Sequence, residues 1–194
     1  MTFVVNDDPV AMFSALYERA AASCAEPDAM VLSTVDADGR PSARYVLLKG
    51  VDERGFTFYT NNGSRKARAM AAHPYAALTF YWAPDTQVRI EGDVEGVSDA
   101  EADAYFATRP RGSQIGAWAS DQSAALESRA ALEARVGEIE RRFANVPVTR
   151  PLFWTGYRVV ARSIEFWTRD PHRLHDRVIF HRHEGVWTRS LLFP

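Results

Sequence analysis

The sequence predicts an α+β protein built on an antiparallel β-barrel. Short apolar runs dominate the chain, and close turn signals separate consecutive runs. Such turns connect antiparallel strands, because parallel strands need a crossover of a dozen residues or more. The length of 194 residues suits one domain with a core of its own. We therefore expect a single domain over residues 1–194, with a short helix at 9–23 and the barrel and further helices at 29–194.

Four stretches carry helical signals. Asp8-Pro9 is a helix N-cap followed by proline at the first helical position, and apolar residues recur at helical spacing up to residue 23. Ser64 precedes a short helix expected at 65–72. Ser98 and Glu101 form a capping box that opens a helix to residue 108. An apolar stripe predicts a helix over 124–144, which packs on the barrel or forms part of a dimer contact.

Strands are expected wherever apolar runs end in turn residues. Pro84-Asp85 joins two of these runs closely and indicates an antiparallel pair. Asp170-Pro171 and Glu184-Gly185 divide the C-terminal part of the chain into its last strands. The expected strands are 30–35, 42–49, 56–60, 75–82 and 86–97, and three more between residue 157 and the C-terminus.

Composition and charge exclude several classes of protein. A net charge of −2 and a pI near 6.2 do not fit bulk nucleic-acid binding. Cys24 is the only cysteine, so the chain has no internal disulfide and no cysteine-based metal site. The N-terminus lacks a signal-peptide pattern, and no apolar run approaches the roughly 20 residues of a membrane span. A cytoplasmic protein is expected.

Lysine is rare here and its two positions are informative. Lys49 and Lys66 are the only lysines among 23 basic residues, so arginine is the default cation. A lysine kept against that bias is a candidate for a site that needs a compact ammonium group. Lys49 ends an apolar run, and Lys66 follows the expected start of a helix. Both positions suggest a ligand rich in phosphate.

The first candidate anion site is Asn61-Asn62-Gly63-Ser64-Arg65-Lys66. Glycine permits a tight turn, Ser64 caps the helix, and free N–H groups lie beside two cations. A helix N-terminus of this kind suits a phosphate. The alternative is a capped surface helix with a solvated basic turn, and the local sequence leaves both interpretations open.

A second candidate comprises Tyr105, Arg109 and Ser113. Tyr105 and Arg109 are four residues apart on one helix face, and Ser113 follows where the chain leaves that helix. Two hydroxyls around a guanidinium form a second cradle for an oxyanion. Alternatively, Arg109 screens the carbonyl groups at the helix C-terminus.

A third candidate is Arg173-Leu174-His175-Asp176-Arg177, with Trp167 upstream as a cover for a planar ligand. If this stretch is extended, Arg173, His175 and Arg177 project on one side. A charged edge strand is the alternative. Four histidines lie between residues 172 and 183, but neighbouring arginines disfavour a divalent ion, so we expect no metal site.

Taken together, these segments resemble the pyridoxamine (pyridoxine) 5′-phosphate oxidase family. The matching blocks occur in family order and run through nearly the whole chain from about residue 8. They are Arg44-Tyr45-Val46-Leu47-Leu48-Lys49, Phe58-Tyr59-Thr60-Asn61, Gly63-Ser64-Arg65-Lys66-Ala67, Gln87-Val88, Tyr105-Phe106, Arg109-Pro110-Arg111, Ser113-Gln114-Ile115-Gly116-Ala117-Trp118, Gln122-Ser123, Ile164-Glu165-Phe166-Trp167 and Arg173-Leu174-His175-Asp176-Arg177.

The resemblance implies an antiparallel FMN-binding split β-barrel with flanking helices, working as a homodimer with FMN at the subunit interface. It implies a substrate phosphate held by Lys49, Tyr105, Arg109 and Ser113, and a pyridine ring faced by Arg173 and His175, the two residues nearest the chemistry. The residues implied to bind FMN are Arg44, Lys49, Tyr59, Thr60, Arg65, Lys66, Gln87, Gln122, Ser123, Trp167 and Arg177.

The activity implied by the resemblance is oxidation of pyridoxamine or pyridoxine 5′-phosphate to pyridoxal 5′-phosphate, in vitamin B6 salvage. Hydride passes from the substrate to the flavin, and O2 reoxidises the flavin with release of H2O2. Arg173 and His175 are assigned to positioning and electrostatic stabilisation, and no residue is identified as a general base.

Three departures from the family pattern keep two alternatives open. Only residues 1–7 precede the first helix, Asp85-Thr86 precedes Gln87 where the family has glutamate and arginine, and Leu191 replaces an arginine. The first alternative is a related flavin oxidase acting on another aromatic substrate, as in phenazine pathways. The second is a non-catalytic binder of flavin or pyridoxal 5′-phosphate. The preferred vitamer is not indicated.

Overall fold

The computed structural model describes residues 7–194, and the expectation of no signal peptide falls mainly on residues 1–6, outside that range. Within it, five helices accompany a nine-stranded antiparallel sheet. The helices are α1 (Pro9–Ala21), α2 (Arg65–Ala72), α3 (Asp99–Thr108), α4 (Arg111–Ala119) and α5 (Arg129–Arg142). The strands are β1 (Ala29–Val35), β2 (Pro41–Leu47), β3 (Gly50–Asp52), β4 (Gly55–Asn61), β5 (Tyr75–Trp82), β6 (Thr86–Gly96), β7 (Trp154–Thr168), β8 (Asp176–His183) and β9 (Val186–Leu191).

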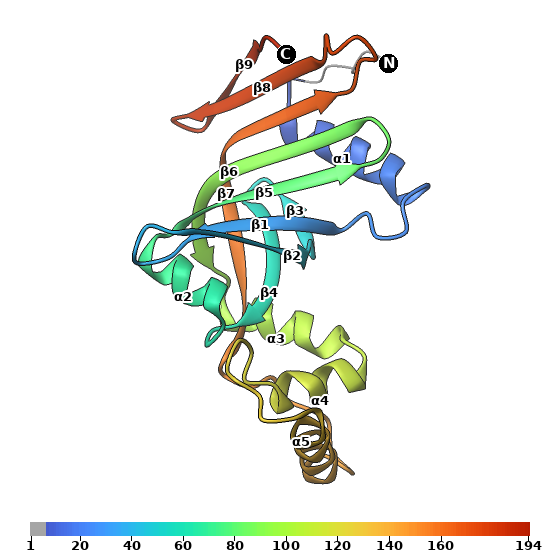
Figure 1. Cartoon of the computed structure of the whole chain (residues 1–194), viewed down its shortest axis with the longest axis vertical. Coiled ribbons are helices and arrows are strands. Elements are labelled where there is room, and N and C mark those ends of the chain that lie inside the picture. The colour runs from blue at the N-terminus through green and yellow to red at the C-terminus, as the bar shows by residue number, and fades with distance from the viewer. Residues whose placement is uncertain (1–6) are drawn as a thin grey trace.

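The sheet curls into a half-barrel around its longest strand, β7. The strand order is β2-β1-β5-β6-β7-β4-β3, and β8 and β9 continue from β7. β4 pairs with the first half of β7 and β8 pairs with its second half, while β6 runs along most of the opposite edge. The two ends of β7 therefore belong to different parts of the molecule, as Figure 1 shows.

A glycine permits the bend between β6 and β7. The register of these strands shifts between Glu91 and Gly92, which marks a β-bulge. A Cβ atom at Gly92 would lie 2.1 Å from the carbonyl oxygen of Val160, so no other residue fits without moving the backbone. The close approach lets β6 follow β7 around the curve of the sheet.

Aromatic residues fill the space between α1 and the concave face of the sheet. Phe13 on α1 is fully buried, and its ring lies 4.9 Å from Phe56, 5.1 Å from Phe80 and 5.6 Å from Trp82, between ring centroids. The Asp8 carboxylate caps α1 by accepting hydrogen bonds from the first amides of the helix. The predicted N-terminal helix is thus confirmed and closes the main core.

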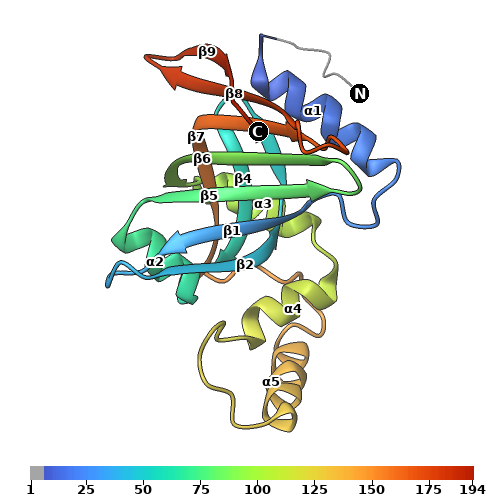
Figure 2. The same ribbon diagram turned by 45° about the horizontal axis from the view of Figure 1, so that its top comes forward.

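α3, α4 and α5 form a second layer at one end of the sheet, away from β8 and β9 (Figures 1 and 2). They enclose a smaller core that includes Phe106, Ile115, Phe143, Val148 and Trp154. All three helices come from the chain between β6 and β7, so this layer is an insertion between two neighbouring strands. Across residues 7–194, none of the helices has the length and apolar character of a membrane span.

Three expectations about the elements were wrong. Residues 111–119 form helix α4, although a loop was expected after the preceding helix. Pro110 at the N-cap position of α4 supplies no side-chain hydrogen bond, and the glycines within α4 hide the helical pattern. The helix predicted at 124–144 begins only at Arg129, because Ser128 caps it there. The short strand β3 was not expected, since its residues fall between the expected strands 42–49 and 56–60. The remaining helices and strands are confirmed within a few residues.

Candidate active site

A cleft of about 680 Å³ lies where the sheet meets the layer of α3 and α4. This size suits a drug-sized ligand or cofactor. The cleft is lined by five of the residues predicted to bind FMN and by all four residues predicted to bind the substrate phosphate, and Lys49 belongs to both sets. The lining residues are Tyr45, Val46, Leu47, Lys49, Tyr59, Thr60, Asn61, Lys66, Tyr105, Thr108, Arg109, Pro110, Ser113, Gly116, Ala117, Ser120, Gln122 and Trp154.

Stacked aromatic rings form one wall of this cleft. The ring of Tyr59 on β4 lies parallel to that of Tyr105 on α3, with centroids 4.0 Å apart, and 5.2 Å from that of Trp154 at the start of β7. Gly156 leaves room for the stack, because a Cβ atom there would lie 2.7 Å from the Tyr59 ring. The stack joins the sheet to the helical layer and fixes the shape of the wall.

Arg109 presents an unsatisfied cationic group to the cleft. Its Nη1 atom is buried without a hydrogen-bond partner among the described residues. Burial lowers the pKa of the Arg109 guanidinium. The same group lies over the Trp154 ring, 4.8 Å from its centroid, in a cation–π contact. A buried N–H donor without an acceptor destabilises the folded protein, so this arrangement suits an anionic ligand that accepts a hydrogen bond from Nη1.

Ser113 lies in the first turn of α4 instead of in a loop, close to the end of α3. Ser113 and Tyr105 line the same cleft as Arg109. The predicted cradle of two hydroxyls and a guanidinium is therefore brought together, although by two helices and not by a helix and a loop.

Lys66 forms the centre of a second cationic region in the cleft. Its Nζ atom donates to Thr60 Oγ1 at 3.1 Å and to Gln122 Oε1 at 2.9 Å. Burial, and then the positive charge of Arg44, lower the pKa of Lys66. Lys66 has no carboxylate partner among the described ion pairs, and Arg44 donates only to neutral groups, on Leu32, Thr34 and Ser42. This end of the cleft therefore carries positive charge that no carboxylate neutralises.

Arg65 and Ser123 lie beside this region but outside the cleft wall. The Arg65 side chain is 60% exposed and lies 3.8 Å from Asp36. Its backbone amide donates to Ser123 Oγ, and Ser123 itself adopts a left-handed backbone conformation with φ of 74°. Ser64 caps α2 by accepting from Ala67 N. The predicted helix start is confirmed, whereas a ligand role for Arg65 and Ser123 stays a prediction.

Lys49 is not a free cation. Its Nζ atom lies 2.7 Å from the carboxylate of Asp28 at the rim of the cleft. The rarity of lysine predicted two anion-binding ammonium groups, and in this chain one of the two is already paired.

The other predicted residues gather on β6, β7 and β8. Gln87 and Arg177 each lie opposite Trp167, on the strands that flank β7. The Trp167 ring is 4.6 Å from the ring of His175. Buried Glu165 accepts from Arg177 Nε at 2.7 Å and lies 3.0 Å from Arg89 Nη2, so it orients the Arg177 guanidinium.

Only Asp176 and Arg177 of the stretch 173–177 belong to a strand, which corrects one condition of the prediction. Arg173 has φ of 64° and lies in a turn that continues to His175, and β8 begins at Asp176. His175 Nδ1 accepts from the backbone amide of Asp170, which fixes its ring beside Trp167. Within residues 7–194 no three His, Cys, Asp or Glu side chains form a group that suits a metal ion.

The candidate residues thus form two groups at opposite ends of β7. Trp154 is the first residue of this 15-residue strand and Trp167 the last but one. At about 3.3 Å per residue the two are on the order of 40 Å apart along the strand. We call them the cleft group (Lys66, Tyr105, Arg109 and Ser113, with their neighbours) and the strand group (Gln87, Trp167, His175 and Arg177).

Sequence reasoning did not single out ten of the residues that line the cleft, and Trp154 and Tyr45 are the two most informative of these. Trp154 stacks on Tyr59 and supports Arg109, and the only local signal was an isolated tryptophan beside Arg-Pro and before a strand. Tyr45 stands within a recognised block but was not singled out; it is 76% exposed, and that exposure is invisible in the local sequence.

Known families and proteins match this chain almost throughout. The family described as "Pyridoxamine 5'-phosphate oxidase" matches residues 16–143, and the "Pyridoxine 5'-phosphate oxidase C-terminal dimerisation region" matches residues 154–194. A "Pyridoxine/pyridoxamine 5'-phosphate oxidase" of Myxococcus xanthus is 56% identical, covering 98% of this chain and 94% of its own. A protein of the same name from Rubrobacter xylanophilus is 56% identical and covers 97% of this chain and 88% of its own.

Solved structures share the fold. PhzG from Burkholderia lata 383, in complex with tetrahydrophenazine-1-carboxylic acid, superposes with a TM-score of 0.92 at 30% identity, covering 98% of this chain and 95% of its own. A pyridoxamine 5'-phosphate oxidase-related, FMN binding protein from Nostoc punctiforme superposes with a TM-score of 0.78 at 17% identity, covering 98% of this chain and 100% of its own. The predicted antiparallel split barrel with flanking helices is confirmed, and the chain belongs to the pyridoxamine 5'-phosphate oxidase family of enzymes.

Proposed function

We propose that this protein oxidises pyridoxamine 5′-phosphate and pyridoxine 5′-phosphate to pyridoxal 5′-phosphate, with FMN as cofactor and O2 as acceptor, releasing H2O2. The observation that carries the proposal is the buried Nη1 of Arg109, which has no partner among the described residues, in a cleft that the hydroxyl-bearing residues Tyr105 and Ser113 also line. A phosphate monoester supplies the acceptor oxygens that this group lacks. The names of relatives at 56% identity over nearly the whole chain agree with this substrate.

The second cationic region fits the phosphate of FMN. Within residues 7–194 Lys66 and Arg44 have no carboxylate partner, and Thr60 and Gln122 add further polar groups. Arg65, at the first position of α2, and Ser123 would complete the set. Two separate cationic regions in one cleft match two separate phosphates. When bound, FMN supplies the hydride acceptor and the reaction with O2.

The residues of the chain bind and orient the substrate. Arg109, Tyr105 and Ser113 would hold its phosphate, which fixes one end of the molecule. His175 and Arg173 would contact the pyridine ring and stabilise charge there, and the hydrogen bond from Asp170 N fixes the orientation of His175. Contacts at the phosphate thus hold the reacting carbon in the orientation that the reaction needs, which increases the rate of the chemical step.

The strand group requires a second copy of the chain in this proposal. The strand group lies at the far end of β7 from the cleft, and residues 154–194, which carry most of it, match a dimerisation region. We infer a homodimer in which the strand group of one protomer completes the cleft of its partner. The apolar side chains Tyr45 and Leu47, exposed on the edge strand β2, suit such a contact.

Mixing two impaired variants, assayed at a substrate concentration well below their KM, tests this shared site. Arg109→Met removes a cleft residue and Trp167→Ala removes a strand residue. After dissociation and random reassociation, half of the dimers are mixed and each contains one intact site, so about a quarter of the wild-type activity returns. Mixing Arg109→Met with Tyr105→Phe, both in the cleft group, is the control and restores nothing. Failure of the first mixture to regain activity refutes the shared site.

A peroxide assay tests the proposed reaction. The purified protein should be yellow and release H2O2 with either phosphorylated vitamer, and anaerobic substrate should bleach its flavin absorbance. Yellow protein that is bleached by neither vitamer contradicts the proposal and favours a non-catalytic flavin binder.

The likeness to PhzG from Burkholderia lata 383 keeps a second function under test, oxidation of a non-phosphorylated aromatic substrate. Comparing kcat/KM for pyridoxine 5′-phosphate and for a reduced phenazine carboxylic acid separates the two. The unpartnered Arg109 predicts preference for the phosphorylated compound. Equal or better turnover of the phenazine compound would favour the second function.

A further inference from the structure

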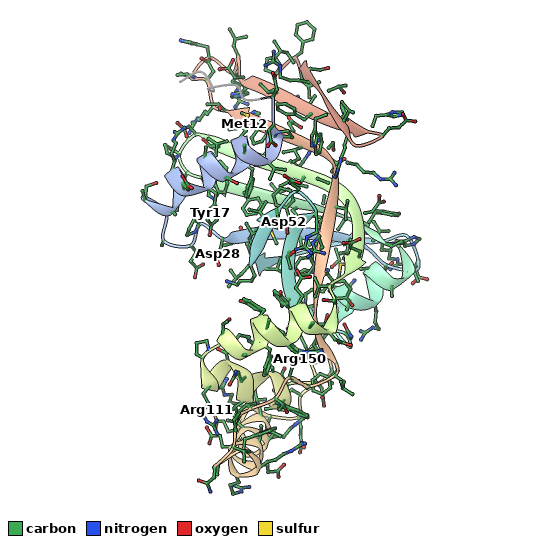
Figure 3. All side chains as sticks on the ribbon, turned by 180° about the vertical axis from the view of Figure 1, so that it is seen from behind. Met12, Tyr17, Asp28, Asp52, Arg111 and Arg150 are labelled. Atoms are coloured by element: carbon green, nitrogen blue, oxygen red, sulfur yellow. The ribbon has the colours of Figure 1, made fainter. Side chains whose placement is uncertain are left out.

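Arg150 joins the two elements that form the phosphate end of the cleft. It lies just before β7, outside the cleft wall, and its side chain is 4% exposed. Its Nε donates to Asp103 at 2.6 Å, Nη2 to Asp99 at 2.7 Å, and Nη1 to the carbonyl oxygen of Trp154 at 2.8 Å. Figure 3 shows Arg150 beside α3.

The two carboxylates and the tryptophan belong to different walls. Asp99 and Asp103 are one turn apart on α3, the helix that carries Tyr105 and ends at Arg109. Trp154 begins β7 and supports the Arg109 guanidinium from below, 4.8 Å from its ring centroid. The distance between α3 and the start of β7 therefore determines where the Arg109 guanidinium lies over the Trp154 ring.

Only a planar, multidentate cation makes these three contacts at once. Burial alone would lower the pKa of Arg150, but the hydrogen bonds and charges of Asp103 and Asp99 raise it above its ordinary value. A second ion pair, between Arg158 and Glu101, also holds α3 against β7, so α3 remains attached when Arg150 is altered. Loss of Arg150 is therefore expected to shift α3 without releasing it.

We infer that Arg150 is a positioning residue for the substrate phosphate, which sets the Arg109 guanidinium through α3 and Trp154. The inference rests on the proposed function for the identity of the substrate. It predicts an effect on phosphate binding that is separate from flavin binding, because Lys66 lies on α2, which Arg150 does not contact.

Arg150→Lys keeps the charge but replaces three separated nitrogen atoms by a single ammonium nitrogen, which cannot reach all three acceptors at once. We expect KM for pyridoxine 5′-phosphate to rise about tenfold, the effect of one charge-assisted hydrogen bond lost. The kcat and the dissociation constant of FMN should stay within about twofold, well below the tenfold change in KM. Arg129→Gln, which breaks the exposed pair with Glu133 on α5, is the matched control and changes none of these values.

A merely structural role predicts a different result. If Arg150 is merely structural, Arg150→Lys lowers thermal stability and flavin retention together and leaves the KM of the folded protein unchanged. That outcome overturns the inference. If Arg150→Lys does not fold, Asp103→Asn replaces it, because this carboxylate is 62% exposed and its loss leaves the buried guanidinium bonded to Asp99 and Trp154. Asp103→Asn should raise KM in the same direction by a smaller factor.

Inorganic phosphate provides a readout without turnover. Flavin-loaded wild-type protein should melt at a higher temperature in phosphate than in chloride of equal ionic strength, and Arg150→Lys should lose most of this increase. If the wild-type enzyme oxidises neither vitamer, the proposed function fails while this comparison still decides the role of Arg150. An equal increase in both proteins, or none in the wild type, refutes it.

Discussion

Replacing Arg109 by methionine separates ligand binding from stability. Methionine keeps an apolar stem against Trp154 and Phe106 but removes the cation whose Nη1 has no partner. A charge-assisted hydrogen bond contributes about 1.5–3 kcal/mol, so its loss raises KM for the phosphorylated substrate by about 10- to 150-fold. The proposed chemistry does not use Arg109 at the reacting carbon, so kcat should change less than KM.

Stability should respond differently. The variant loses cation–π contacts of about 0.5–1 kcal/mol but also loses a buried, unsatisfied donor that costs about 1–3 kcal/mol. The two contributions oppose each other, so the free energy of unfolding should stay the same or rise by about 1 kcal/mol. For a chain of this size 1 kcal/mol corresponds to a melting-temperature shift of about 2–4 °C.

Arg111→Met is the matched control two residues away. Arg111 Nη2 donates to the carbonyl oxygen of Phe143 at 2.5 Å and Nη1 to that of Val146 at 3.4 Å, so it joins α4 to the end of α5 (Figure 3). Its loss should lower the free energy of unfolding by about 1–3 kcal/mol and leave KM unchanged. KM is measured by peroxide release with saturating FMN, and stability by thermal melting. Arg109→Met with a wild-type KM, or Arg111→Met with the larger change in KM, refutes the assignment of the buried donor to the phosphate.

Three other perturbations test the remaining parts of the structure. Because burial and then Arg44 lower the pKa of Lys66, its positive charge is lost at a lower pH than that of an ordinary lysine. FMN affinity in the wild type should therefore begin to fall at a pH below the range in which an ordinary lysine loses its proton, and it should fall less in Lys66→Arg. Fluorescence titration measures both curves, and parallel curves contradict this role. Glu165→Gln weakens the contact that orients Arg177, so it should lower the free energy of unfolding by about 1–3 kcal/mol and weaken FMN binding. Its control is Glu91→Gln, at the exposed partner of Arg89, which should change the free energy of unfolding by at most about 0.5 kcal/mol. Equal effects of the two variants argue against an orienting role for Glu165. Phe13→Ala should lower the free energy of unfolding by about 3–5 kcal/mol in denaturant titrations, and a loss below about 1 kcal/mol would show that α1 does not close the main core.

Local signals predicted most elements because the energies that form them are local. Asp8, Ser64 and Ser98 each accept from amides within three residues, and these caps correctly marked the starts of α1, α2 and α3. α4 has no such cap, since Pro110 stands at its N-cap position, and it was missed. The sequence of α5 continues apolar before Ser128, so periodicity alone began this helix too early.

The candidate site was predictable only as separate pieces. The motifs around Lys66 and Arg109 could be read because each is short and locally coherent. The pairing of Lys49 with Asp28, 21 residues earlier, and of Arg150 with Asp99, 51 residues earlier, depends on the sheet topology. For the same reason, no local pattern indicates that Arg109 lies beside the first residue of β7 while Trp167 lies near its last residue. This separation is the reason why the proposed enzyme needs a second protomer.

The cleft draws on two parts of the fold, and Gln122, which follows α4 in the helical insertion, connects them by accepting from Lys66. Thr60 and Lys66 belong to β4 and α2, on the strand framework of the fold, whereas Tyr105, Arg109 and Ser113 belong to helices inserted between the neighbouring strands β6 and β7. An insertion at this point can change without altering the strand pairing that holds the first set. If Thr60 and Lys66 bind the cofactor and Tyr105, Arg109 and Ser113 bind the substrate, as proposed, the two sets lie on different parts of the fold. Substitutions in α3 and α4 should therefore change substrate preference while the protein keeps its flavin. Substitutions around Lys66 should weaken flavin binding while the substrate preference stays the same.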